Sequence, residues 1–166
     1  MKKKNSKRKY SIPTIPFRRK REKRTNYKKR MALLKSNSVR LVVRRFNKNI
    51  VAQLVKYSDD GDHVLSTVHS SSLKKLGKKI VSGNCSESYL TGMLIAKKAK
   101  QLKVEGAVVD IGLHTSTKGS RIYSLINGAV DGGLKINVDK ALFPSQEKIK
   151  GKDPAEFEKI KQAILK

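Results

Sequence analysis

Hydrophobic residues follow two different spacings along the chain, and the first of them predicts strands. In residues 39–44, Val39, Leu41 and Val43 alternate with Arg40, Val42 and Arg44. This period of two is typical of a half-buried strand. A second apolar run at 50–57 follows a short polar connection, and a third strand at 63–68 follows the turn 58–62. Three consecutive strands with short links predict an antiparallel meander.

Beyond residue 84 the spacing becomes helical. Asn84 is placed to cap a helix with Glu87 three residues later, and this helix ends in the lysine-rich turns at 97–103. A second helix is predicted to begin near Ser120, because apolar residues recur from there at intervals of three and four. Between the helices, residues 107–111 are short and apolar, which predicts a buried strand parallel to the first.

The order βββ-α-β-α predicts one three-layer α/β domain with a mixed sheet. The chain has 166 residues, enough for one domain and its extensions. We divide it into an N-terminal extension at 1–35, an α/β core at 36–143 and a tail at 144–166. Asp153 and Pro154 begin a short C-terminal helix in that tail.

Basic residues are concentrated at the N-terminus. The chain has 39 Lys and Arg against 13 Asp and Glu, a formal net charge of +26, and residues 1–30 hold 15 of the cations and a single acid, Glu22. This segment has few aliphatic residues, so we predict an extended arm that a partner orders. Tyr10, Phe17 and Tyr27 lie among the cations, and planar rings stack on unpaired bases. This pattern favours a nucleic-acid-binding arm over a solvated tail or localisation signal.

Composition excludes other classes of protein. Apolar residues make up 37% of the chain, and no apolar run approaches the roughly 20 residues of a membrane span. The N-terminus lacks an apolar signal region, so we expect a cytoplasmic protein without membrane contact. Cys85 is the only cysteine, which excludes an intramolecular disulfide and a zinc site built on cysteine pairs. No cofactor is expected.

Loop 113–120 is the best candidate for a phosphate contact. It carries hydroxyls, Lys118 and Gly119 beside a helix start, where unpaired N–H groups attract anions. The loop lacks the glycine spacing of a nucleotide-binding P-loop. We interpret it as a contact for an RNA backbone, although a plain helix cap has a similar sequence.

Support for catalysis is poor. Asp110 stands alone in its strand, whereas two-metal nucleases need several converging carboxylates. The acids of turn 58–62 are interpreted as solubilising a hairpin turn. The three histidines lack metal-ligand spacing, and each is interpreted as structural or RNA-facing. Cys85 lies at a helix start, where a thiolate would be stabilised, but no histidine is near it in sequence to serve as a base.

Five segments carry a resemblance to known proteins. In chain order they are FRRKREKRTNY at 17–27, RLVVR with NKNI and Gln53 at 40–53, YLTG at 89–92, DIGL with TKG at 110–119, and GAVDGGL at 128–134. Together they resemble the L-eighteen family of large-subunit ribosomal proteins in its archaeal form, whose eukaryotic members are called L-five. The resemblance runs from about residue 17 to about residue 151, and the long insertion and C-terminal extension of the eukaryotic form are missing.

The resemblance implies a non-enzymatic protein of the large subunit that binds 5S rRNA and joins it to the large-subunit rRNA in the central protuberance. It implies a ribonuclease-H-like fold without catalytic acids, in agreement with the lone Asp110, and a neighbouring second 5S-binding protein. The basic arm, the first hairpin and the start of the second helix are the expected RNA contacts. The expected contact residues are Arg18, Arg19, Arg21, Arg24, Tyr27, Arg30, Arg40, Arg44, Arg45, Asn47, Lys48, Thr115, Thr117, Lys118 and Arg121.

Two alternatives remain open at this point. An RNase-H-like nuclease would use Asp110, and its metal-dependent cleavage would be lost in Asp110→Asn. A general nucleic-acid-compacting protein would use charge alone and would not distinguish DNA from RNA, but it leaves the patterned domain behind the arm without a role.

Overall fold

The computed structural model describes residues 15–78, 81–151 and 153–165. The predicted order βββ-α-β-α is confirmed for the body, and short helical elements that the sequence pattern did not reveal are added to it. In chain order the elements are α1 (Arg18–Arg21), α2 (Tyr27–Leu34), β1 (Arg40–Arg45), β2 (Ile50–Ser58), β3 (Gly61–His69), η1 (Ser70–Leu76), α3 (Cys85–Gln101), β4 (Val108–Asp110), α4 (Arg121–Asp131), η2 (Lys140–Leu142), α5 (Gln146–Lys150) and α6 (Pro154–Leu165).

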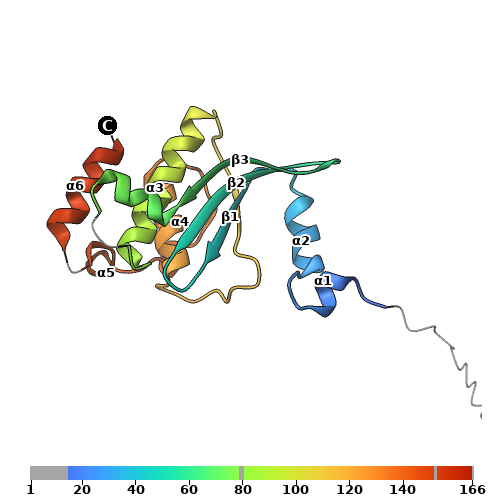
Figure 1. The fold of residues 1–166 in the computed structure, drawn as a ribbon. Coiled ribbons are helices and arrows are strands. Elements are labelled where there is room, and N and C mark those ends of the chain that lie inside the picture. The colour runs from blue at the N-terminus through green and yellow to red at the C-terminus, as the bar shows by residue number, and fades with distance from the viewer. Residues whose placement is uncertain (1–14, 79–80, 152, 166) are drawn as a thin grey trace, which may run out of the picture.

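The four strands form one mixed sheet in the order β3-β2-β1-β4 (Figure 1). β2 is antiparallel to both β1 and β3, whereas β4 is parallel to β1, as predicted. In this register Val42 on β1 lies opposite Asp110 on β4. The carboxyl ends of β1 and β4 therefore meet at one edge of the sheet, and the loops that follow both strands begin there.

Three layers make up the body. Helices α3 and α4 cover one face of the sheet, and η1, α5 and α6 pack against α3 on the side away from the strands (Figure 1). The predicted single α/β domain with a mixed sheet is confirmed. Arg40, Val42 and Arg44 alternate along β1 with the core residues Leu41 and Val43, so they belong to the opposite face of the sheet.

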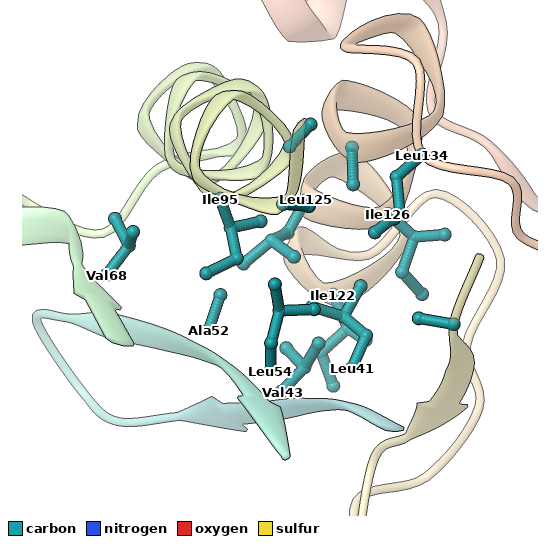
Figure 2. Packing of buried hydrophobic residues seen from close by; sticks show 14 of the residues in the cluster. Leu41, Val43, Ala52, Leu54, Val68, Ile95, Ile122, Leu125, Ile126 and Leu134 are labelled. Carbon is teal, nitrogen blue, oxygen red and sulfur yellow. The ribbon is translucent and has the colours of Figure 1, made fainter. Parts of the chain in front are cut away.

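Alternate positions on the strands supply the core between the sheet and the helices. Leu41, Val43 and Leu54 point from β1 and β2 toward Ile95 on α3 and Leu125 on α4, and all five are fully buried (Figure 2). Each such side chain contributes roughly 1.5–3 kcal/mol to burial free energy. The residues that the period-two pattern predicted to face the core are thus the ones that are buried.

The C-terminal helix α6 closes a second, smaller core. Its Phe157, Ile160 and Ile164 are buried, and the ring of Phe157 lies 5.6 Å from that of Tyr89 on α3, centroid to centroid. These three residues are the apolar face expected for a helix beginning at Pro154. The predicted C-terminal helix is confirmed.

Helices α3 and α4 approach each other closely at two glycines. A Cβ added to Gly92 would lie 2.0 Å from the carbonyl oxygen of Leu125, and one added to Gly128 would lie 2.0 Å from that of Tyr89. Real side-chain carbons do not approach a carbonyl oxygen this closely, so only glycine allows the observed separation of the two backbones. Both glycines belong to segments that the sequence singled out without a structural reason.

Two local predictions are wrong. The arm was expected to be extended, but within 15–35 the chain forms α1 and α2, and the side chain of Asn26 caps α2 by accepting from the N–H of Lys29. Asn84 makes no side-chain cap on α3; Glu87 instead accepts from the N–H groups of residues 82 and 83. Tyr10, a proposed stacking residue, lies outside the described residues.

Candidate RNA interface

Two groups of predicted contact residues, far apart in sequence, lie at one edge of the body. The N–H of Arg45 donates to Nε2 of His114 at 3.2 Å, which joins the end of β1 to the loop after β4. Nη1 of Arg121 donates to the carbonyl oxygens of Gly83, at 2.8 Å, and Asn47, at 3.3 Å. These bonds connect the β1–β2 turn, the loop before α4 and the entry to α3.

We call this surface the basic edge. Its members are the eight predicted contact residues of the body that reach solvent at the ends of β1 and β4 or at the start of α4. Arg44 and Arg121 are partly buried, and the other six are exposed. The basic edge consists of Arg44, Arg45, Asn47, Lys48, Thr115, Thr117, Lys118 and Arg121.

Arg44 is held in a fixed orientation at the centre of this edge. Its Nη1 donates to the carbonyl oxygens of Val43 and Asp110, both at 2.9 Å, and its Nη2 lies 3.5 Å from the Asp110 carboxylate. Gly112 leaves room for the guanidinium, since an added Cβ would lie 3.0 Å from the Arg44 Cζ. The side chain is 37% exposed, so its outer side remains available to a phosphate or a base.

His114 is neutral in this arrangement. Partial burial lowers the pKa of His114, and the nearby cations Arg45 and Arg44 lower it further. A neutral ring can accept with Nε2 only while Nδ1 carries the proton, so the bond from the Arg45 N–H sets the tautomer. His114 is thus a structural residue of the basic edge that leaves an N–H donor on its other nitrogen.

Arg40 was predicted to contact RNA, and the structure corrects this prediction. Its side chain is only 2% exposed. Nη2 lies 2.6 Å from an oxygen of Asp62, and Nη1 lies 3.6 Å from an oxygen of Asp110. The guanidinium is buried because two carboxylates from distant parts of the chain neutralise it, so it does not reach the surface.

Asp62 has a structural role that the sequence interpretation missed. It was grouped with the acids that solubilise a hairpin turn, yet it bridges Arg40 to Arg30 of the arm, whose Nη2 lies 2.8 Å from Asp62 Oδ2. Burial by itself raises the pKa of Asp62, but hydrogen bonds and attraction from Arg40 and Arg30 outweigh it and hold the pKa below the usual 3.8. The charged form of Asp62 is therefore favoured by folding.

Asp62→Asn is expected to destabilise the folded chain by about 2–3 kcal/mol at pH 7, because it leaves the buried Arg40 with Asp110 as its remaining carboxylate. The stabilisation from Asp62 is present above pH 3.8, where the unfolded group is charged, and is lost as the pH falls through the lower pKa of the folded state. Urea unfolding should therefore show a smaller difference between variant and parent at pH 3 than at pH 7.

The matched control for this experiment is Asp59→Asn, which removes an exposed carboxylate from the same turn. It should change the free energy of unfolding by less than about 0.5 kcal/mol. Equal effects of the two substitutions would contradict a specific role for Asp62.

The arm forms a small helical unit, which we call the knob (residues 15–35). Arg19 Nε donates to the Thr25 hydroxyl at 2.8 Å, and Glu22 pairs with Arg18 at 3.7 Å and Arg24 at 3.3 Å. Neither α1 nor α2 has a buried residue. Local polar contacts, rather than a core, hold the two helices together, and Arg18, Arg19, Arg21 and Arg24 are exposed.

Long side chains join the knob to the body. Besides the pair between Arg30 and Asp62, Lys29 Nζ donates to the carbonyl oxygen of Gly112 at 3.3 Å. Gly112 lies in the loop that carries the basic edge. Arg30, expected to bind RNA, therefore has a protein partner already, and Lys29, which the sequence did not select, links the two cationic surfaces.

Lys148 is a second cation that the sequence did not select. Its Nζ donates to the carbonyl oxygen of Gly119 at 3.0 Å, inside the candidate phosphate loop. It lies on α5, a five-residue helix. A helix this short has too few turns to show a periodic signal, and nothing local connects Lys148 with the loop.

The arrangement can bind anions, and the strand carboxylate Asp110 already has cationic partners. Asp110 is held by Arg40 and Arg44, and its other oxygen accepts from the N–H of Gly112 at 2.8 Å. Across 15–78, 81–151 and 153–165, no three His, Cys, Asp or Glu side chains form a group that could hold a metal ion. Burial raises the pKa of the Cys85 thiol, which is the opposite of the thiolate stabilisation considered from its position in the sequence.

Known proteins are similar to this chain in sequence. The model of the family described as ribosomal large subunit proteins 60S L5 and 50S L18 matches residues 13–107 and 98–139. Large ribosomal subunit protein uL18 of Methanoregula boonei is 40% identical over 152 residues, covering 92% of this chain and 87% of the relative.

The chain is therefore a structural protein of the large ribosomal subunit, and a component of the cytoplasmic ribosome. Within that class it belongs to the family of 60S L5 and 50S L18 proteins, as the five sequence segments indicated. None of the described helices is both long and apolar enough to cross a membrane.

Proposed function

We propose that the chain binds 5S rRNA and attaches it to the large-subunit rRNA in the central protuberance, next to a second 5S-binding protein. The observation that carries the proposal is the presence of two cationic surfaces, the knob and the basic edge, on one chain. Lys29 of the knob donates to Gly112 in the loop that carries the basic edge, and Arg30 pairs with Asp62 of the body. The separate positions of the two surfaces allow one protein to contact two RNA segments at once. Family membership supports the choice of ribosomal RNA as the partner.

The contacts divide into two kinds. Exposed Lys and Arg of the knob neutralise phosphates and release counterions, which supplies affinity without reading sequence. The basic edge adds the Arg44 guanidinium, which the fold holds in place, and the exposed hydroxyls of Thr115 and Thr117. Fixed donors recognise the shape of a folded RNA, because their spacing matches only certain arrangements of phosphates and splayed bases.

Selective recovery of 5S rRNA tests the proposal. The full chain, immobilised and incubated with total cellular RNA at physiological salt, should retain 5S rRNA preferentially over tRNA and fragments of the large rRNAs. Sequencing of the bound RNA measures the enrichment. Equal retention of all three classes would leave only charge-driven binding and would overturn the assignment of 5S rRNA.

A charge-matched pair of variants locates the contact. Lys118→Gln removes an exposed cation of the basic edge, and Lys159→Gln removes an exposed cation of α6, on the layer farthest from the sheet. The first should weaken binding and lower the slope of log K against log salt by about one, whereas the second should change neither.

A further inference from the structure

The knob carries an exposed apolar stripe in the most charged part of the chain. The rings of Phe17 and Tyr27 are in contact, with centroids 5.3 Å apart and planes tilted by 50°. Phe17 is 72% exposed, Tyr27 is 37% exposed, and Met31, one turn further along α2, is 60% exposed. Apolar groups that stay in water on a folded unit are typical of a surface that meets a partner.

We propose that the Phe17–Tyr27 ring pair is a stacking site for one unpaired base of the bound RNA. This inference rests on the proposed function and assigns a role to a ring pair that the phosphate contacts do not use. Stacking is favoured because the occupant must present a flat apolar face and carry negative charge close by. An unpaired nucleotide has both, since its base is planar and its phosphate is an anion.

The charge around the rings argues for RNA over a protein partner. Residues 15–35 hold ten Lys or Arg and one acid, and four of the arginines flank Phe17 along the chain at positions 18, 19, 21 and 24. An ordinary protein surface would have to supply many acids to approach this unit, whereas an RNA strand supplies one charge with every nucleotide.

The knob also places the two rings together before any ligand arrives. Asn26 caps α2 directly before Tyr27, and Arg19 ties the start of the unit to Thr25 at 2.8 Å. Because local bonds set the relative position of the helices, the ring pair is a prepared site. A site that needs little ordering loses less free energy on binding.

Tryptophan fluorescence tests the stacking directly. The chain has no Trp, so Phe17→Trp introduces a single reporter at the site. Titration with a 5S rRNA transcript should quench this fluorescence strongly, because an indole stacked on a base loses emission. The matched control is Leu165→Trp, at a position 66% exposed on α6, whose emission should hardly change. Equal quenching at both positions, or none at position 17, would overturn the proposal.

Binding variants provide the second test. Phe17→Leu and Tyr27→Leu should each weaken binding of the 5S rRNA transcript about tenfold. The slope of log K against log salt should stay unchanged, because no charge is lost. Met31→Leu, which keeps an apolar side chain on the same stripe but removes no ring, should bind like the parent. A loss at Met31 as large as at the rings would show that the rings are not specifically required and would overturn the stacking site.

The outcomes separate the two proposals. If the parent chain retains 5S rRNA selectively and the ring variants bind as well as the parent, the stacking site is wrong and the proposed function stands. If the Phe17→Trp reporter is quenched equally by 5S rRNA and by unrelated RNA with unpaired loops, base stacking stands and the assignment of 5S rRNA fails.

Discussion

Gly128→Ala is expected to destabilise the folded body by about 3 kcal/mol or more, because the new methyl group would lie 2.0 Å from the carbonyl oxygen of Tyr89. The contact is with backbone, so no side-chain rotation relieves it, and α3 and α4 must move apart. Leu125 and Ile95 lie between these helices and the sheet, so the separation also opens the main core.

The expected loss of stability is opposite in sign to the usual effect of replacing Gly with Ala in a helix, so the experiment tests the close approach of α3 and α4 directly. In an unconstrained helix interior, replacing Gly with Ala stabilises by up to about 1 kcal/mol, because alanine loses less backbone entropy. Urea unfolding followed by circular dichroism should instead show a loss, with the melting temperature about 6–12 °C lower. Gly106→Ala is the control: the nearest atom to its added Cβ is 3.3 Å away, so a small change of either sign is expected. A stabilised Gly128→Ala variant would show that the helices do not approach as described.

Removal of residues 1–35 is expected to weaken binding of a 5S rRNA transcript by about a hundredfold or more at physiological salt and to lower the salt slope by several units. The deleted segment holds 16 of the 39 Lys and Arg. The body should remain folded, because α1 and α2 contribute no buried residue and Arg40 keeps its carboxylate partners. Circular dichroism and unfolding curves check the fold, and filter binding across a salt series measures the slope.

Charge and shape of the arm can be separated by a second variant. Replacing Lys20, Arg21, Lys23 and Lys28 together with Gln removes four exposed cations. It keeps the chain length, the ring pair and the contacts of Arg18, Arg19 and Arg24 that hold the knob together. It should lower the slope by about four while leaving part of the affinity. If the truncated chain kept the parent's slope, the arm would not be the main phosphate contact, and the basic edge would have to account for the salt dependence.

Much of the body was predictable because its signals are local. The period-two alternation around Leu41 and the helical spacing after Ser120 both arise because one side of a single strand or helix is buried. Such a pattern is visible within a few neighbouring residues. The arm was mispredicted for the opposite reason. A cation-rich segment with no core has no apolar period, and the one local signal that it does contain, Asn26 before Tyr27 as an N-cap, is weak by itself.

Which of the expected contact residues reach the surface could not be read from the sequence. Arg40 and Arg44 are four residues apart on one strand and look alike in the sequence. Arg40 is buried because Asp62 reaches it from the start of β3, and Arg44 remains partly exposed because Asp110 holds only one side of it. No pattern around residue 40 contains this information, since both carboxylates come from elsewhere in the chain.

The amino-acid order by itself determined the charge of the arm, the sequence of strands and helices, and the faces that they bury, because these depend on neighbours within a few residues. Only the tertiary structure decided that the hairpin and the loop after β4 form one basic edge, that Asp62 couples the arm to Arg40, and that Gly92 and Gly128 set the distance between two helices. Each of these features depends on atoms that are tens of residues apart in the sequence and that strand pairing or helix packing brings into contact. The pattern of residues along the chain does not indicate which distant residues will meet.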